Sequence, residues 1–302
     1  MKSFFSLVFA VLLITCCYGQ KEKLELNLVK GETYTLKSTT NFSFDVPLNG
    51  KQVRTVSLTY CDVKFKVADI HDSIFEMDAK IDSIRYNGNL FSFSLNMAAN
   101  LKGPISNDSK NLALERILKS LKGMPYHFKM SRTGVVSELK NMNADTSRFQ
   151  LTCNLLFRQM AHTIPAIYPT TKVSPGDKWN ISITIQPSAA FNVKNIIYEL
   201  TEVTDSTLLI SGSSTLKIDD KDAKNLKVPE NIKQDITTTF LSNIILDRKT
   251  GWIIDAKSKQ IIKGTITEKA VPKKSGNKVH QLNLKSEITL AGNKSYYYRE
   301  IL

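Results

Sequence analysis

The sequence has few of the residues that usually build a catalytic or metal site. It contains 4 cysteines, 4 histidines and 2 tryptophans among 302 residues. The histidines, His71, His127, His162 and His280, stand singly, and no pair has the spacing of a zinc site. No phosphate-binding glycine loop and no Gly-x-Ser-x-Gly elbow is present. The sequence therefore predicts no catalytic, cofactor-binding or metal-ligating residue, and we expect a protein that is not an enzyme.

Long apolar runs are also missing, apart from one at the start. Phe4–Ile14 is apolar, follows the basic residue Lys2, and is followed by small residues at Cys17–Gly19. It is shorter than the ~20 residues of a membrane span, and polar sequence begins at once with Gln20–Lys23. This pattern predicts a cleaved signal peptide over residues 1–19. We expect an exported mature chain without a transmembrane segment, in the periplasm, associated with an outer membrane, or extracellular.

The four cysteines fall into two pairs. Cys16 and Cys17 lie in a stretch similar to a bacterial lipoprotein box, which makes both candidate lipidation sites, although Thr15 fits that box poorly. The alternative is that both are discarded with the signal. In the mature chain, Cys61 and Cys153 could form one disulfide, but two buried thiols are the favoured interpretation.

The chain has an excess of positive charge. Its net charge is +13, and removal of the signal, whose single charge is Lys2, leaves +12. Such an excess favours anionic surfaces, for example lipid headgroups or acidic glycans. The alternative is a solvated surface rich in lysine, because the lysines are widely spread. Nucleic acid is not an expected partner, since the chain has an export signal and no basic helix or stacking motif.

Two short phrases occur twice, in the same order. Gly31–Tyr34 (GETY) and Gly176–Trp179 (GDKW) each precede an alternating apolar run, and later come Ser131–Val136 (SRTGVV) and Arg248–Ile254 (RKTGWII). Glycine in such places supplies a left-handed turn residue. We interpret the two phrases as the signature of a duplicated β unit, with Tyr34 and Trp179 closing one end of the sheet.

Most of the chain alternates apolar and polar residues, as a half-buried strand does. The alternation changes phase after Tyr60, which predicts a β-bulge there. Two stretches have helical spacing instead: one ends at Gly123, and one follows the capping residues at 145–147. The expected fold is mainly β, a duplicated antiparallel sheet built as a sandwich or half-open barrel units, with two helical insertions.

The domain boundaries follow from these repeats. After the signal peptide at 1–19, we expect a first β repeat with a helical insert at 20–145. A linking helix and loop would occupy 146–172, and a second β repeat 173–302.

Three segments carry a resemblance to a known family. They are Lys23–Tyr34 (KLELNLVKGETY), Val173–Trp179 (VSPGDKW) and Asp247–Gly251 (DRKTG). Together they resemble a family of exported bacterial proteins catalogued only as a domain of unknown function. The resemblance implies export from a bacterium with an outer membrane, and supplies no catalytic residue.

The favoured function is a non-catalytic binding or carrier protein for an apolar or anionic ligand. It rests on the aromatic run Phe91–Met97 and the apolar helix that ends near Leu121. The alternative is a structural scaffold of the envelope, and the third is a hydrolase with a site not visible in the sequence. The penicillin-recognising enzymes are strongly disfavoured, because Lys249–Gly251 and Ser137–Lys140 occur without the Ser-Asp-Asn element between them.

Overall fold

A computed structural model describes residues 21–48, 51–88, 119, 121–141, 167–182, 195–218, 232–268 and 278–295. Its elements are eleven strands: β1 (Thr33–Leu48), β2 (Lys51–His71), β3 (Ile74–Gly88), β4 (Pro125–Ser131), β5 (Val136–Asn141), β6 (Lys178–Ile181), β7 (Ile196–Val203), β8 (Thr207–Ile218), β9 (Ile232–Asp247), β10 (Ile253–Glu268) and β11 (Lys278–Ser295).

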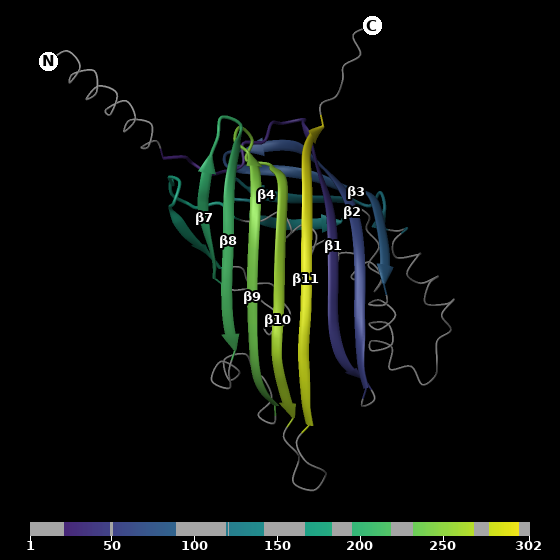
Figure 1. The fold of residues 1–302 in the computed structure, drawn as a ribbon. Coiled ribbons are helices and arrows are strands. Elements are labelled where there is room, and N and C mark those ends of the chain that lie inside the picture. The colour runs from purple at the N-terminus through teal and green to yellow at the C-terminus, as the bar shows by residue number, and fades with distance from the viewer. Residues whose placement is uncertain are drawn as a thin grey trace, which may run out of the picture.

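All eleven strands belong to one open antiparallel sheet. Its order is β5-β4-β3-β2-β1-β11-β10-β9-β8-β7-β6, so each half is a meander and β1 joins the halves by pairing with β11. Figure 1 shows β8 to β11, β1 and β2 side by side as long strands. The predicted antiparallel, mainly β class is confirmed. The two halves are not separate sandwich or half-open barrel units, because the β1–β11 pairing makes them a single open sheet with edges at β5 and β6.

The two predicted helical insertions are not supported, since every element of the described residues is a strand. Almost all of both helices, with Cys153 and His162, lies outside the described residues. The end of the first helical stretch is described. There Leu121 is fully buried, and Gly123 has a φ of 77°, the left-handed conformation that commonly ends a helix.

The predicted phase change in β2 is wrong. The strand keeps one phase from Thr55 to Val67: Thr55, Ser57 and Cys61 are buried, whereas Val56 and Tyr60 are exposed. The register irregularities of the β2–β3 pairing come later, between Asp62 and Val63 and between Val67 and Asp69. The apolar side chains therefore point outward in this part of β2, and the hydroxyl side chains point inward.

The duplicated phrases occupy equivalent places in the topology. Gly31 and Gly176 precede β1 and β6, and their amides donate to Val67 of β2 and Leu200 of β7, the next strand in each half. In each half the Thr-Gly pair follows four strands later, between β4 and β5 and between β9 and β10. Duplication as the origin of this arrangement stays a prediction.

The core occupies one end of the sheet. Buried side chains from both halves form a single cluster there, which shows that the inner faces of the two halves meet. Large members of this cluster are Tyr34, Phe65, Phe128, Tyr198 and Trp252. A second, small cluster lies farther along the long strands; it consists of Ile236 and Ile262 with Leu216, Ile266, Leu282 and Leu284 around them.

Cys61 is a free, buried thiol. Burial, with a smaller contribution from Asp62, raises the pKa of this thiol from 9.0 to about 12. Above pH 9 the unfolded chain ionises the thiol and the folded chain does not, so the free energy of unfolding falls as the pH rises toward 12. We expect urea unfolding at pH 8 to 11 to show this loss, and Cys61→Ala to make it smaller. If the free energy of unfolding of Cys61→Ala falls with pH as steeply as that of the wild type, Cys61 is not the source of the pH dependence.

Candidate ligand-binding face

Between their ends, the six long strands carry no Asp, Glu, Lys or Arg on the inner face; the inward register positions with charged residues, Lys51, Glu268, Lys278 and Lys294, lie at strand ends. Directly paired residues share a face, so the registers define it without ambiguity. The face consists of alternate residues from Tyr34 to Phe44, from Val53 to Val67, from Leu208 to Leu216, from Gln234 to Leu246, from Ala256 to Ile266 and from His280 to Gly292.

The outer face of the same strands is charged. On β10, for example, Asp255, Lys257, Lys259 and Lys263 alternate with the inward residues. On β11, Glu287 contacts Lys259 and Lys285 through ion pairs of 3.8 and 3.0 Å. The contrast between the faces extends beyond the core cluster as far as Val53, Ile266 and His280, and the next inward register positions on these strands are Lys51, Glu268 and Lys278.

Some buried polar atoms of the inner face have no hydrogen-bond partner. They belong to five side chains: Thr55 on β2; Gln234, Thr238 and Ser242 on β9; and Gln260 on β10. Thr55, Thr238 and Ser242 are 1%, 2% and 4% exposed. Leaving a buried polar group unpaired costs about 1–3 kcal/mol, so these five groups, spread over β2, β9 and β10, lower the stability of the sheet.

An extended segment closes the core end of the sheet. Residues 22–29, called here the N-terminal strap, lie between the two Thr-Gly turns: Leu26 N–H donates to Arg132 O, and Asn27 N–H donates to Thr250 O, both at 2.8 Å. Leu24, Leu26 and Leu28 are buried, as their alternation predicts. The strap forms a single β-bridge, from Glu22 to Val173, rather than a strand of the sheet.

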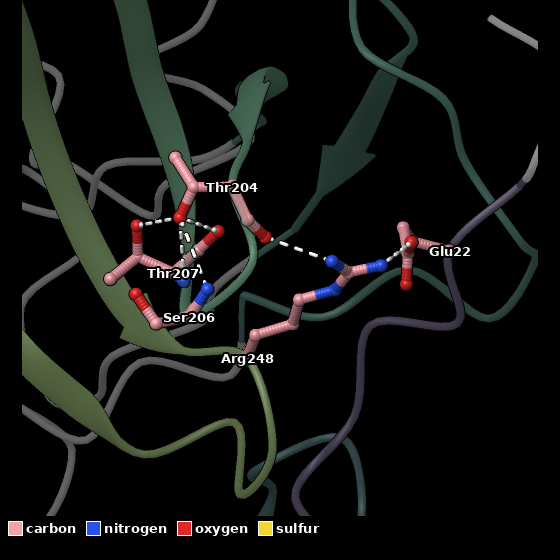
Figure 2. Close-up of polar contacts among 5 residues, drawn as sticks. All are labelled: Glu22, Thr204, Ser206, Thr207 and Arg248. Carbon is pink, nitrogen blue, oxygen red and sulfur yellow. Dashed lines mark hydrogen bonds and ion pairs between the residues drawn. The ribbon is translucent and has the colours of Figure 1, made fainter. Parts of the chain in front are cut away.

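Arg248 fastens the start of the strap to the second half of the sheet (Figure 2). Its guanidinium donates to the Glu22 carboxylate at 2.6 Å and to the carbonyl oxygen of Thr204 at 2.9 Å. Thr204 in turn orders the β7–β8 turn, because its hydroxyl accepts hydrogen bonds from the amides of Ser206 and Thr207. One arginine thus joins the strap, the β7–β8 turn and the β9–β10 turn.

We expect the Arg248–Glu22 ion pair to contribute about 1 kcal/mol, because the two side chains are 34% and 23% exposed and partly screened by water. A double-mutant cycle of Arg248→Met and Glu22→Gln, measured by urea unfolding, tests this. The exposed pair Lys129–Glu138 is the control, and we expect no measurable coupling there. If the two substitutions change the free energy of unfolding additively, the ion pair contributes nothing to stability.

The residues singled out from the sequence do not form a site. His71 and His127 lie beside Asp69 and Asp78, at 3.7 and 2.9 Å, in separate pairs, and the described residues hold no cluster of three metal-ligating side chains. His280 lies on the inner face of β11, opposite Ile266. Cys16, Cys17 and Phe91–Met97 are outside the described residues.

Tyr34 and Trp179 are the two aromatic residues that we expected to close one end of the sheet. Tyr34 is fully buried, and its hydroxyl accepts a hydrogen bond from the amide of Val29. Trp179 is half-buried and donates to Ile167 O at 2.7 Å.

A hollow of about 360 Å³ lies between β1 and β11, lined by Thr35, Lys37, Ala291, Gly292 and Asn293. Most of its lining faces outward, so it is not part of the inner face. Within the described residues, no helix has the length and hydropathy needed to cross a membrane.

One solved structure shares the fold of this chain. It is lipovitellin, from a study of lipid–protein interactions, with a TM-score of 0.50 and 10% identity over 91% of this chain. The chain spans 26% of the lipovitellin chain. An outer membrane channel from Pseudomonas putida F1 (8% identity, 88% of this chain and 97% of that chain) and P47 from Clostridium botulinum A2 (8%, 93% and 84%) have TM-scores of 0.18 and 0.19, which carry no argument.

Sequence comparison gives one match. No curated protein matches the chain. The match to a family model confirms the resemblance to a family of unknown function and covers about a third of the chain, from the segment before β6 to the start of β10. Over residues 154–253, the sequence matches the family of unknown function named DUF6263.

Proposed function

We propose that the protein is an exported, non-catalytic binding or carrier protein that holds an apolar ligand on the inner face of its sheet. The observation that carries this proposal is the absence of charged residues from the inward positions of six adjacent strands, apart from Lys51, Glu268, Lys278 and Lys294 at strand ends, beside a charged outer face. An open sheet of this kind can accommodate a long hydrocarbon chain along its strands.

The energetics favour such a ligand. Burying one methylene group gains about 0.8 kcal/mol, so a chain of about sixteen carbons gains on the order of 10 kcal/mol before the costs of association are subtracted. The small cluster around Ile236 and Ile262 offers apolar contacts away from the core. The half-buried Phe42 and Phe44 extend these contacts onto β1.

The likeness to lipovitellin supports the same proposal. At 10% identity it concerns the fold only, but that fold occurs in a protein whose structure describes lipid–protein interactions. Export rests on the signal sequence at residues 1–19, and the expectation that the protein is not an enzyme rests on the lack of a catalytic motif.

Native mass spectrometry tests the proposal. The protein is expressed with its own signal in a bacterium with an outer membrane, purified, and weighed under native and denaturing conditions. We expect added mass that disappears on denaturation, which identifies a non-covalent ligand. The denatured mass also shows where the mature chain begins and whether Cys16 or Cys17 is acylated. A ligand-free native mass would count against the carrier function.

The scaffold alternative has one observation in its favour. Several large apolar side chains are exposed on the outer face, among them Val56, Leu241 and Val279 at 43%, 54% and 57%. They are spread over separate strands among charged residues, which is usual for a surface in water. The edge strands β5 and β6 are short, with 6 and 4 residues, and short edges discourage pairing with other chains.

A further inference from the structure

We propose that the outer face of strands β8 to β11 binds the protein to an anionic lipid surface. This inference goes beyond the proposed function, because it concerns the face opposite the inner one and does not depend on a ligand bound there. It starts from the charges on these four strands, which lie side by side in Figure 1.

The outward residues of the four strands carry an excess of lysine. They are the alternate residues of 211–217, 233–243, 257–267 and 279–289, called here the basic face, and they include six lysines against two acidic residues, a net charge of +4. The six lysines are all exposed: Lys217, Lys233, Lys257, Lys259, Lys263 and Lys285. Asp255, the next outward residue of β10 toward the core, borders the basic face.

Three of the lysines surround one apolar side chain. Ile261 on β10 lies directly opposite Lys285 on β11, and Lys259 and Lys263 are the next outward residues on its own strand. Lys285 is therefore a diagonal neighbour of both, at about 7–8 Å. Glu287 contacts Lys259 and Lys285, at 3.8 and 3.0 Å, and is the one carboxylate among the described residues that does so. Because like charges at this separation repel each other, an anionic partner would stabilise the group.

Other lysines of the basic face have no counter-charge nearby. Among the described residues, Lys217, Lys257 and Lys263 form no ion pair. An uncompensated positive surface attracts anions and raises their rate of association. The net charge of +12 on the mature chain acts in the same direction.

Apolar side chains among the lysines favour lipid over a soluble acidic polymer. Leu241 lies directly opposite Lys259 and is 54% exposed. Val279 lies opposite Thr267, at the far end of the basic face, and is 57% exposed. Between lipid headgroups such side chains can leave water, which is favourable in proportion to their apolar area. An acidic glycan in solution would satisfy the lysines alone.

Co-sedimentation with vesicles tests the proposal. The purified full-length mature protein is mixed with vesicles of phosphatidylcholine alone, or with about a third of phosphatidylglycerol added. Each lysine near an anionic bilayer strengthens binding roughly fivefold, so a net charge of +4 gives an expected preference of several hundredfold for the anionic vesicles at low salt. We expect the preference to fall below about twofold in roughly 0.5 M NaCl, because salt screens the attraction.

A triple variant locates the binding surface. Lys217→Gln, Lys257→Gln and Lys263→Gln remove three charges without breaking an ion pair among the described residues. We expect binding to the anionic vesicles to weaken about a hundredfold. Arginine at the same three positions keeps the charge, and we expect that variant to bind within about twofold of the wild type.

A second triple variant is the matched control. Lys122→Gln, Lys140→Gln and Lys172→Gln remove the same number of charges from exposed positions outside β8 to β11. We expect this variant to bind the anionic vesicles within about threefold of the wild type, because these positions are not on the basic face.

The outcomes that contradict the proposal are distinct from those that test the inner face. No preference for anionic vesicles, or a preference that high salt leaves unchanged, would overturn it. Equal losses in the two glutamine variants would overturn the assignment to the basic face. Binding to dextran sulfate in solution without binding to vesicles would identify an acidic glycan as the partner and overturn the lipid assignment. The ligand of the inner face is tested separately by native mass spectrometry.

Discussion

Replacing Trp252 by alanine is expected to lower the free energy of unfolding by about 4 kcal/mol, the range for a large aromatic residue in a core. Trp252 is 4% exposed and contacts Tyr34 and Phe65, with ring centroids 5.1 and 5.6 Å apart. Its indole N–H donates to the carbonyl oxygen of Thr35 at 3.2 Å. One side chain of the β9–β10 turn therefore packs on β1 and β2, so its loss loosens the contact between the halves.

Two further variants give this measurement its controls. Trp252→Phe keeps an aromatic ring and loses the hydrogen bond to Thr35, and we expect a smaller loss of about 1–2 kcal/mol. Trp179→Ala removes the other tryptophan, which is half-buried on the edge strand β6 and stacks on Tyr198. Denaturant unfolding measures all three. If Trp179→Ala lowers the free energy of unfolding as much as Trp252→Ala does, the contact of Trp252 with β1 and β2 contributes no more to stability than a side chain on an edge strand.

The Gly251→Ala variant is expected to lose about 3 kcal/mol, or roughly 5–10 °C in melting temperature. Gly251 has a φ of 70°, which costs any other residue about 1–2 kcal/mol. A methyl group here would also overlap the carbonyl oxygen of Glu25 and lie 3.2 Å from Leu26 Cα. The strap would have to move away from the turn, which overpacking makes costly.

Gly31→Ala and Gly176→Ala are matched controls for this effect. Both glycines have left-handed φ values, of 83° and 91°, and a methyl group at either would meet no atom within 4 Å. The decrease in stability of these two variants measures the backbone cost alone. The additional decrease in Gly251→Ala therefore measures the steric contact with the strap. Equal losses at the three positions, by thermal unfolding, would show that the strap tolerates the extra methyl group.

Local alternation predicted the strands well where buried residues are apolar. Leu24, Leu26 and Leu28 alternate with polar residues and are buried, and the same holds for Tyr34 and Leu36. The same logic failed where the inner face is polar. Around Tyr60 it placed the apolar residues inward, because nothing local distinguishes a face that carries hydroxyl groups from a solvated one.

Local alternation of apolar and polar residues does not predict which strands pair when they are far apart in the sequence. The pairing of β1 with β11, as between Thr33 and Ser295, joins residues from opposite ends of the chain. No local pattern specifies such a pairing, and therefore a sandwich seemed as reasonable as one sheet. The unpaired polar side chains of the inner face were missed for the same reason, since the register is needed to place Gln260 diagonally opposite Thr238 and Ser242. The signal present in the sequence was the lack of charge at every second residue, sustained from Gln234 to Leu246 and from Ala256 to Ile266.

The strap also sets the order in which the protein can be completed. Glu22 and its partner Arg248 are 226 residues apart, so at about 5–20 residues per second a ribosome makes the arginine about 10 to 45 s after the glutamate. During that time the strap has neither Arg248 nor the second Thr-Gly turn to bind. A chain whose strap depends on such late residues cannot complete its fold until Arg248 and the second Thr-Gly turn have been synthesised.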